Sequence, residues 1–288
     1  MRWPVETLCA AVSPLLPGFA VEVLPSVDST NTELMRRARA GRCAPSLLVA
    51  ERQTAGRGRL GRVWHSDAAH GAAHGAGGAI PSLTMSLGLP FAPRDWSGLS
   101  LAVGVSVAES LQPVLPPRGA QRPARLGLKW PNDLWLDSAA GERKLGGILL
   151  ETTSLVARGP AASCSAARYA VLGIGINVLP RSAEGLSLPP GSLQDLEPGL
   201  DAPAALLRIV GPLVAMLQAF EQHGFGPVQP RFAARDLLHG RAVALSDGRT
   251  GSAHGVREDG ALLVRMAGAL QAISGAEISV RPSAAQPV

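Results

Sequence analysis

The sequence predicts an α+β protein in two parts. Segments with the two-residue apolar period of strands interleave with segments that have the period of helices, a pattern typical of an α/β or α+β domain. From about His239 the pattern changes to short apolar runs separated by glycine turns, which indicates a compact antiparallel β-barrel of about 45 residues. With 288 residues, 46% of them apolar, the chain can bury a sizeable core. We therefore expect one domain over 1–236 and a second over 237–288.

The region up to residue 41 is expected to form two helices with a strand between them. The pattern predicts a short helix over 5–15 and a strand over Ala20–Leu24. Thr30 and Glu33 match a capping box, and Gly41 would end the second helix. Residues 29–31 therefore lie at a helix N-terminus. The segment before them is too short for a helix-turn-helix domain.

The remaining elements follow from the same periods. Further strands are expected over 46–51, 83–89, 125–130, 144–151 and 169–177, and helices over 97–115 and 203–223. The strand over 83–89 alternates apolar with small or polar residues, which predicts a half-buried strand. The segments 67–81 and 180–203 are expected to be loops. No carboxylate or cysteine cluster joins His70 and His74 in the first of them, so it favours a mobile loop over a metal site.

The composition argues against several classes of protein. A net charge of +5 suits an acidic partner or a polyphosphate, but aromatic residues are only 4% and no long basic run appears, so we expect no DNA binding. The longest apolar stretch, 204–217, is interrupted by Arg208, Gly211 and Pro212, so no membrane span is expected. The N-terminus lacks the apolar run of a signal peptide, which favours a cytoplasmic protein.

Cysteines and lysines are both scarce. Cys9, Cys43 and Cys164 are widely spaced and have no zinc-binding pattern around them, which indicates core or surface residues. Only Lys129 and Lys144 are lysines among the 27 basic residues. A compositional bias towards arginine explains the scarcity. The alternative is that a compact ammonium group is required at these two positions, where a guanidinium group would not serve.

A glycine-rich basic loop follows the strand over 46–51. It reads Gly56-Arg57-Gly58-Arg59-Leu60-Gly61-Arg62 and satisfies the GxGxxG pattern. A dinucleotide site would need a helix directly after the glycines and an acidic residue about twenty positions later, and neither is present. The arginines instead suit bidentate contacts with phosphate or carboxylate oxygens. The alternative is a solvated basic turn.

A second motif is a strand that runs into a Pro-Asn-Asp turn, Lys129-Trp130-Pro131-Asn132-Asp133, followed after a short gap by Lys144. A tight hairpin would bring both lysines close to Asp133. Lys144 opens an apolar strand, so its ammonium could reach a site where opposite charge counts for more than in water. The alternative is a surface salt bridge between Lys144 and Asp133, which would contribute little.

A third motif is the buried strand over 171–178, which contains Gly173, Gly175 and Asn177. Glycines in a strand permit close approach of a ligand or of another backbone. The Asn177 amide could pair with a polar ligand edge. A core strand that ends in a capping asparagine fits the sequence equally well.

Together with Ser29, Thr30 and Asn31, these motifs resemble, in order and over residues 27–281, those of biotin protein ligases. The resemblance implies a mixed β-sheet flanked by helices, similar to class II aminoacyl-tRNA synthetases, with an SH3-like barrel at the C-terminus. It also implies the activity of the family. Such enzymes join biotin to ATP with Mg²⁺ as biotinyl-5′-adenylate. They then transfer biotin to one lysine of the biotin carboxyl carrier protein of acetyl-CoA carboxylase.

The resemblance also assigns residue roles. The implied catalytic residues are Lys144, Arg57 and Asp133. The implied biotin-binding residues are Ser29, Thr30, Asn31, Gln53, Arg57, Gly58, Arg59 and Lys144. The implied nucleotide-binding residues are Arg57, Arg59, Trp130, Asn132 and Asn177. The ligands of the metal are not indicated, and a homodimer is left open.

The chain departs from the best-known family pattern in three places. Leu60 stands where some relatives have another arginine, and the insertion over 67–81 enlarges a nearby loop. No DNA-binding domain precedes Val27, so we expect a ligase that does not repress transcription. Lipoate and octanoate ligases share this type of fold, and ligation of one of those acids is the alternative activity.

Overall fold

The computed structural model describes residues 2–66, 80–117, 123–155, 168–182, 189–275, 278 and 280–282. The chain forms two compact units. Unit 1 comprises Met1–Ala92 and Arg143–Ala215, and unit 2 comprises Pro93–Glu142 and Met216–Val288. Most of the predicted loop over 67–81 and the third cysteine, Cys164, lie outside the described residues. The domain boundary between 236 and 237 stays a prediction.

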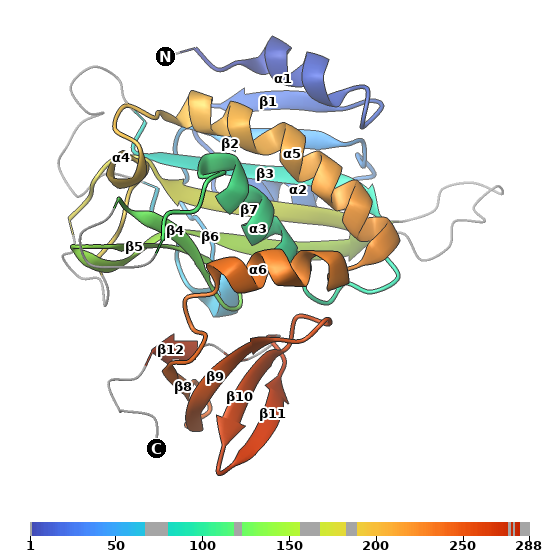
Figure 1. Ribbon diagram of the computed structural model, residues 1–288. Coiled ribbons are helices and arrows are strands. Elements are labelled where there is room, and N and C mark those ends of the chain that lie inside the picture. Colours follow the sequence, from blue (N-terminus) through green and yellow to red (C-terminus); the bar gives the residue numbers. More distant parts are fainter. Residues whose placement is uncertain are drawn as a thin grey trace. The chain divides into compact units, whose positions relative to one another are not determined.

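Unit 1 is built on a mixed sheet, as the resemblance implied. Its strands lie in the order β1-β2-β3-β7-β6 (Figure 1). Their bounds are β1 Ala20–Leu24, β2 Ser46–Ala50, β3 Ser82–Phe91, β6 Gly141–Ser154 and β7 Arg168–Asn177. The β1–β2 pair is parallel and the other pairs are antiparallel. The five strands predicted for these segments are confirmed, with ends that differ by a few residues.

The helices of unit 1 agree with prediction less completely. Helix α1, Val5–Val12, is shorter than expected, and α2 runs over Thr30–Arg39. The predicted capping box of Thr30 and Glu33 is wrong. Ser29 is the N-cap, and its hydroxyl accepts from Thr32 N at 3.4 Å. Glu33 forms ion pairs with arginines of its own helix instead, because its carboxylate lies within reach of their side chains.

Strand β3 is buried on both faces, so the prediction of a half-buried strand is wrong. Thr84 and Ser86, on the face expected to meet solvent, are 1% and 0% exposed. Helix α2 packs against β3 and β7 and covers this face. The hydroxyls are satisfied there, since Thr84 Oγ1 donates to Ala50 O at 2.6 Å and Ser86 contacts the start of α2. Polar residues on a strand face that is covered by a helix suggest a buried binding site rather than a solvent-exposed surface.

Apolar side chains of α2 bind this helix to the sheet. The cluster consists of Leu34, Met35, Ala38, Leu48, Tyr169 and Val171. Tyr169 is the only tyrosine of the chain and is 1% exposed. Burial, followed by the nearby Cys43, raises the pKa of its phenol to about 12.

The titration of Tyr169 gives a direct test of this packing. We expect ultraviolet difference absorbance to show one tyrosine that ionises near pH 12 in the folded protein and near pH 10 in denaturant. Because this phenol ionises at a lower pH in the unfolded chain than in the folded protein, its contribution to the free energy of unfolding should be fully present below pH 10. That contribution should decrease as the pH rises from 10 to 12. A midpoint near 10 without denaturant would contradict the buried placement of the phenol.

Unit 2 contains a β-hairpin, two helices and a second sheet. The hairpin pairs β4, Arg125–Lys129, with β5, Asp133–Ser138, and the helices are α3, Leu99–Leu111, and α6, Gln229–Arg235. The second sheet is antiparallel, in the order β11-β10-β9-β8-β12 (Figure 1). Its strands are β8 Ala242–Leu245, β9 Thr250–Val256, β10 Leu262–Met266, β11 Ala269–Ile273 and β12 Val280–Pro282. The antiparallel C-terminal unit is therefore confirmed, and its closure as an SH3-like barrel stays a prediction.

The sequence missed three short elements. They are strand β5, helix α6, and helix α4, Leu193–Leu196, which lies inside the loop predicted over 180–203. The loop prediction is wrong for its described C-terminal part. There the Ser192 hydroxyl and backbone N–H both bond to Asp195 and form a capping box that starts α4. A single turn of this kind is too short to show a helical period.

Helix α5 is the long helix expected over 203–223 and runs over Ala202–His223. Pro212 lies inside it without ending it. By length and apolar content α5 could cross a membrane, contrary to the sequence argument, in which interruptions made the stretch too short. Within its most apolar window 56% is buried inside the protein, as in a core helix.

Candidate active site

Four buried polar residues gather where α2 begins, and we call them the α2 polar cluster: Thr30, Asn31, Gln53 and Ser86. Gln53 Oε1 accepts from Thr30 N at 2.8 Å and lies 3.1 Å from Thr30 Oγ1. The Ser86 hydroxyl lies 2.7 Å from Thr30 Oγ1 and 2.6 Å from Asn31 Oδ1. Buried polar atoms are costly unless they are hydrogen-bonded, so these paired side chains form a specific polar arrangement in the fold.

Three of these four residues, Thr30, Asn31 and Gln53, were among the residues implied to bind the ligand, and the structure brings them together. Ser29, which was implied to bind the same ligand, is buried beside them as the N-cap of α2. Ser86 was missed. The signal that could have revealed it is the row of small and polar residues along 84–88, which was interpreted as a solvent-exposed face.

The glycines of β7 make room for two side chains. Ser86, Gly173 and Leu149 lie side by side on β3, β7 and β6. A Cβ at Gly173 would lie 2.2 Å from Asn31 Oδ1, so Asn31 rests directly on this glycine. A Cβ at Gly175 would lie 2.6 Å from the Trp64 ring. The close approach that the sequence allowed is thus made by side chains of this chain, and Trp64 is a second residue that was missed.

The basic loop is a compact turn anchored at both ends. Gly58 N donates to Arg62 O at 2.7 Å, and a short 3₁₀ turn spans Arg59–Gly61. A Cβ at Gly56 would lie 2.3 Å from Trp64 O, which explains that glycine. Leu60 has φ 56° and ψ 37° and is 53% exposed. A left-handed leucine costs about 1–2 kcal/mol, so the loop holds local backbone strain.

Glu151 of β6 joins this loop to the α2 polar cluster and was not predicted. Its carboxylate lies 3.0 Å from Arg57 Nη1 and accepts from Asn31 Nδ2 at 3.0 Å. The same Asn31 amide group also donates to Leu149 O at 3.2 Å. Arg57 is therefore held by a specific ion pair, which argues against the alternative of a merely solvated basic turn.

Lys144 lies on β6, with its backbone fixed from two directions. Its carbonyl accepts from Gly191 N at 2.8 Å and from Asn177 Nδ2 at 3.4 Å. The Asn177 amide also donates to Gly191 O at 3.0 Å and accepts from Arg181 at 2.8 Å. These bonds give Asn177 a positioning role beside Lys144. Its predicted contact with a nucleotide stays a prediction.

The Lys129–Asp133 motif lies in unit 2. Lys129 Nζ is 3.7 Å from Asp133 Oδ2 and 5.3 Å from the centre of the Trp135 ring. Trp130 is 1% exposed, and its indole N–H donates to Gly260 O at 3.0 Å. Asn132 is half-buried in the turn that follows, and Asp133 is half-buried at the start of β5. The approach of Lys144 to this motif and the nucleotide contacts of Trp130 and Asn132 stay predictions.

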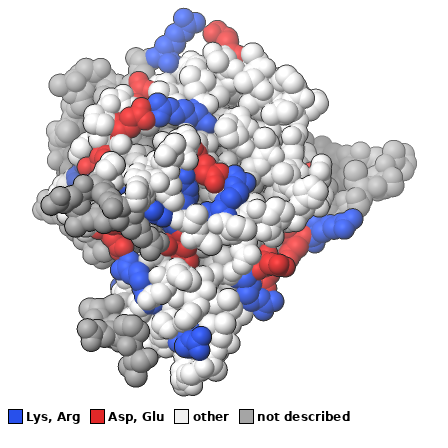
Figure 2. All heavy atoms as spheres, viewed as in Figure 1, with Lys and Arg blue, Asp and Glu red and all other residues white. Residues whose placement is uncertain are grey.

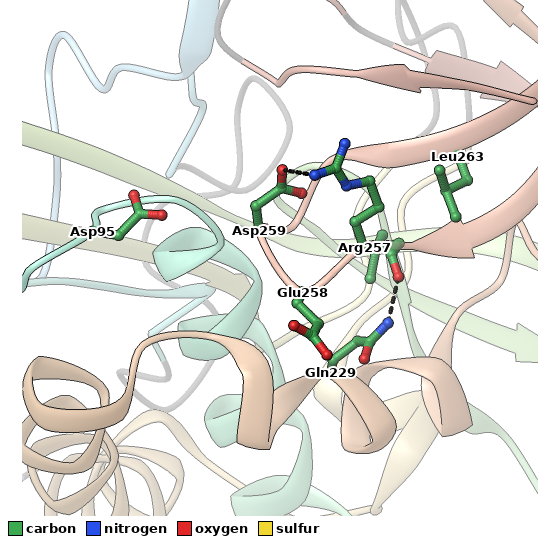
Figure 3. Close-up of a pocket in the computed structure, with 7 residues that line it drawn as sticks. Asp95, Gln229, Arg257, Glu258, Asp259 and Leu263 are labelled. Carbon is green, nitrogen blue, oxygen red and sulfur yellow. Dashed lines mark hydrogen bonds and ion pairs between the residues drawn. The ribbon is translucent and has the colours of Figure 1, made fainter.

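A cavity in unit 2 has a mainly acidic lining. It is lined by Asp95, Gln229, Val256, Arg257, Glu258, Asp259 and Leu263 (Figure 3). Three of these are carboxylates, and the one guanidinium among them pairs with Asp259 at 3.2 Å. Such a lining repels carboxylates and phosphates, so the cavity does not suit the anionic ligands that were predicted for the basic loop.

Charges of both signs lie beside one another on the face of the protein seen in Figure 2. This arrangement gives no support to binding of nucleic acid through a single basic stripe. Within the described parts of the chain, no group of three or more His, Cys, Asp or Glu residues could hold a metal ion.

Comparisons with known proteins point in one direction. A model of the biotin/lipoate A/B protein ligase family matches residues 23–166. The bifunctional ligase/repressor BirA of Escherichia coli is 35% identical over 271 residues, which cover 92% of this chain and 75% of that protein. A biotin--[acetyl-CoA-carboxylase] ligase of Mycobacterium tuberculosis is 31% identical, covering 90% of this chain and 88% of that one. The structure of biotin protein ligase from Aquifex aeolicus in complex with biotin and ATP matches with TM-score 0.70 and 26% identity, covering 91% of this chain and 99% of that chain.

Proposed function

The chain belongs to the biotin/lipoate A/B protein ligase family, and we propose that it is a biotin protein ligase. In the proposed reaction, a biotin carboxylate oxygen attacks the α-phosphorus of ATP and pyrophosphate leaves. An acceptor lysine amine then attacks the acyl carbon of biotinyl-5′-adenylate, AMP leaves, and an amide bond forms. We propose the biotin carboxyl carrier protein of acetyl-CoA carboxylase as the acceptor, with the reaction in the cytoplasm.

The observation that carries this proposal is the α2 polar cluster. The ureido group of biotin has two N–H donors and one carbonyl acceptor, so a site for it needs both kinds of partner close together. The hydroxyls of Ser29, Thr30 and Ser86 and the amide of Gln53 provide both kinds in a buried setting. A lipoyl or octanoyl chain has no such group and would leave these atoms unpaired.

The chemistry of the first step requires cations. Two anions, the carboxylate and the α-phosphate, must meet, and negative charge develops on the phosphorus oxygens in the transition state. We propose that Lys144 offsets this charge and that Arg57, with Gly58 and Arg59, closes over the acyl chain and phosphate. Lys144 suits this role because the hydrogen bonds at its carbonyl hold its stretch of β6 in place.

We propose that the nucleotide is bound by the residues that the resemblance names for it. Trp130, Asn132 and Asn177 would contact the nucleotide, and Asp133 would orient the reacting groups. ATP is expected to bring Mg²⁺ on its phosphates, since Mg²⁺ is commonly bound by one or two carboxylates together with phosphate oxygens. The described residues offer no cage of three or more metal ligands, so no step is assigned to the metal.

The function is tested by incubating the protein with biotin, ATP-Mg²⁺ and a purified biotin carboxyl carrier domain. Mass spectrometry should show one biotinyl group added to the carrier. In pyrophosphate exchange, biotin should be preferred over lipoate or octanoate by roughly 10⁴-fold or more, because those acids leave buried hydrogen-bonding groups unpaired. Exchange supported by lipoate or octanoate but not by biotin would overturn the proposal in favour of the alternative ligase.

A further inference from the structure

We propose that Glu151 is a positioning residue that sets the direction of the hydrogen bonds in the α2 polar cluster, so that Thr30 presents an acceptor to a ligand N–H. The inference rests on the proposed function, because it concerns recognition of the ureido group. It assigns a role to a carboxylate that lies outside the cluster and reaches it only through Asn31.

The first step is the orientation of Asn31. Its Nδ2 lies within hydrogen-bond distance of Leu149 O and of Glu151 Oε2. A backbone carbonyl and an ionised carboxylate are acceptors only, so the NH₂ group must face them. The Asn31 Oδ1 is then turned towards Ser86, and a flipped amide would bring its oxygen against a negative charge.

The second step is the proton of Ser86. This hydroxyl lies 2.6 Å from Asn31 Oδ1 and 2.7 Å from Thr30 Oγ1, and its one proton can serve only one of them. Among the described residues, Ser86 is the donor that faces the Asn31 oxygen, and this contact is the shorter of the two, so the proton goes to it. The bond to Thr30 then requires that Thr30 donates its own proton to Ser86.

The third step concerns the hydrogen bonds that remain available to the Thr30 hydroxyl. Gln53 Oε1 already accepts from Thr30 N at 2.8 Å, and its contact with Thr30 Oγ1 is longer, at 3.1 Å. With its proton directed to Ser86, Thr30 Oγ1 keeps a lone pair for an incoming donor. A ureido N–H is such a donor, whereas the dithiolane of lipoate and the alkyl chain of octanoate are not.

Glu151 also has a cationic partner. Its carboxylate is 23% exposed and pairs with Arg57, so the charge that orders Asn31 is itself offset. Glutamine at this position would present both an oxygen and an NH₂ group, so it would no longer favour one orientation of Asn31, and only Leu149 O would still require the NH₂ group on this side. The direction of the chain of hydrogen bonds would then be held less strongly.

The test is a double-mutant cycle on biotin affinity, measured by calorimetry with the full chain. Glu151→Gln is expected to raise the Kd for biotin roughly tenfold, because a hydrogen bond to a charged group orders the site. In a Ser86→Ala background the same change should have an effect of less than about threefold, since no hydroxyl proton remains to be directed.

The matched control is Glu22→Gln, which also removes a carboxylate from an arginine ion pair in unit 1 but contacts no residue of the cluster among the described side chains. It should leave the Kd for biotin unchanged, and Tm values should show that each variant is folded. Equal affinity in Glu151→Gln and the wild type would overturn the inference, as would effects that simply add in the double variant. Failure of the wild type to bind biotin would instead overturn the proposed function.

Discussion

Replacement of Lys144 by methionine is expected to lower the rate of biotinyl-adenylate formation by roughly a hundredfold or more, by analogy with removal of one transition-state donor. Methionine keeps much of the volume of lysine and removes the ammonium. The backbone carbonyl of residue 144 accepts hydrogen bonds from Gly191 N and Asn177 Nδ2, and these bonds remain after the substitution, so the variant should fold. Single-turnover formation of the adenylate, measured with saturating biotin and ATP, gives the rate of the affected step.

The charge-matched control is Arg208→Met. Arg208 forms an exposed ion pair with Glu197 in the same unit, and its loss changes the net charge equally. This variant should form adenylate at close to the wild-type rate. If Lys144→Met did the same, Lys144 would have no catalytic role. Biotin transfer from supplied biotinyl-adenylate shows whether any defect is confined to the first step.

A second large effect is expected at Gly173, where alanine should raise the Kd for biotin by roughly a hundredfold. The new Cβ would lie 2.2 Å from Asn31 Oδ1, a distance that no pair of non-bonded atoms accepts. Asn31 cannot move aside without loss of its bonds to Ser86 and Glu151. Buried polar groups left unpaired cost about 1–3 kcal/mol each, which gives the expected loss. Calorimetry with biotin measures it directly.

Gly211 provides the opposite case with the same substitution. It lies in α5, and a Cβ there would meet no atom within 4 Å. Alanine is the better helix former by about 1 kcal/mol, so Gly211→Ala should raise the Tm and leave biotin affinity unchanged. An equal loss of affinity in both variants would show that the effect at Gly173 does not come from contact with Asn31.

Sequence patterns predicted the local structure around candidate site residues where the local chemistry was distinctive. Ser29, Thr30 and Asn31 could be placed at a helix N-terminus because cap residues precede an apolar helical stripe. The glycines and arginines around Arg57 predicted a phosphate or carboxylate site, and that role stays a prediction. Glu151 could not be found, since an acid at the end of an apolar strand has no pattern of its own.

The sequence by itself determined the family, the change from mixed helices and strands to short strands near the C-terminus, and most of the residues at the α2 polar cluster. These properties depend on residue type and on short spacings, which are visible along the chain. Only the tertiary structure decided that β3 is covered on both faces, that Asn31 rests on Gly173, and that one carboxylate at position 151 joins Asn31 to Arg57. Such contacts join residues up to 120 positions apart. The folding of several strands into one sheet creates them, and no local pattern records them.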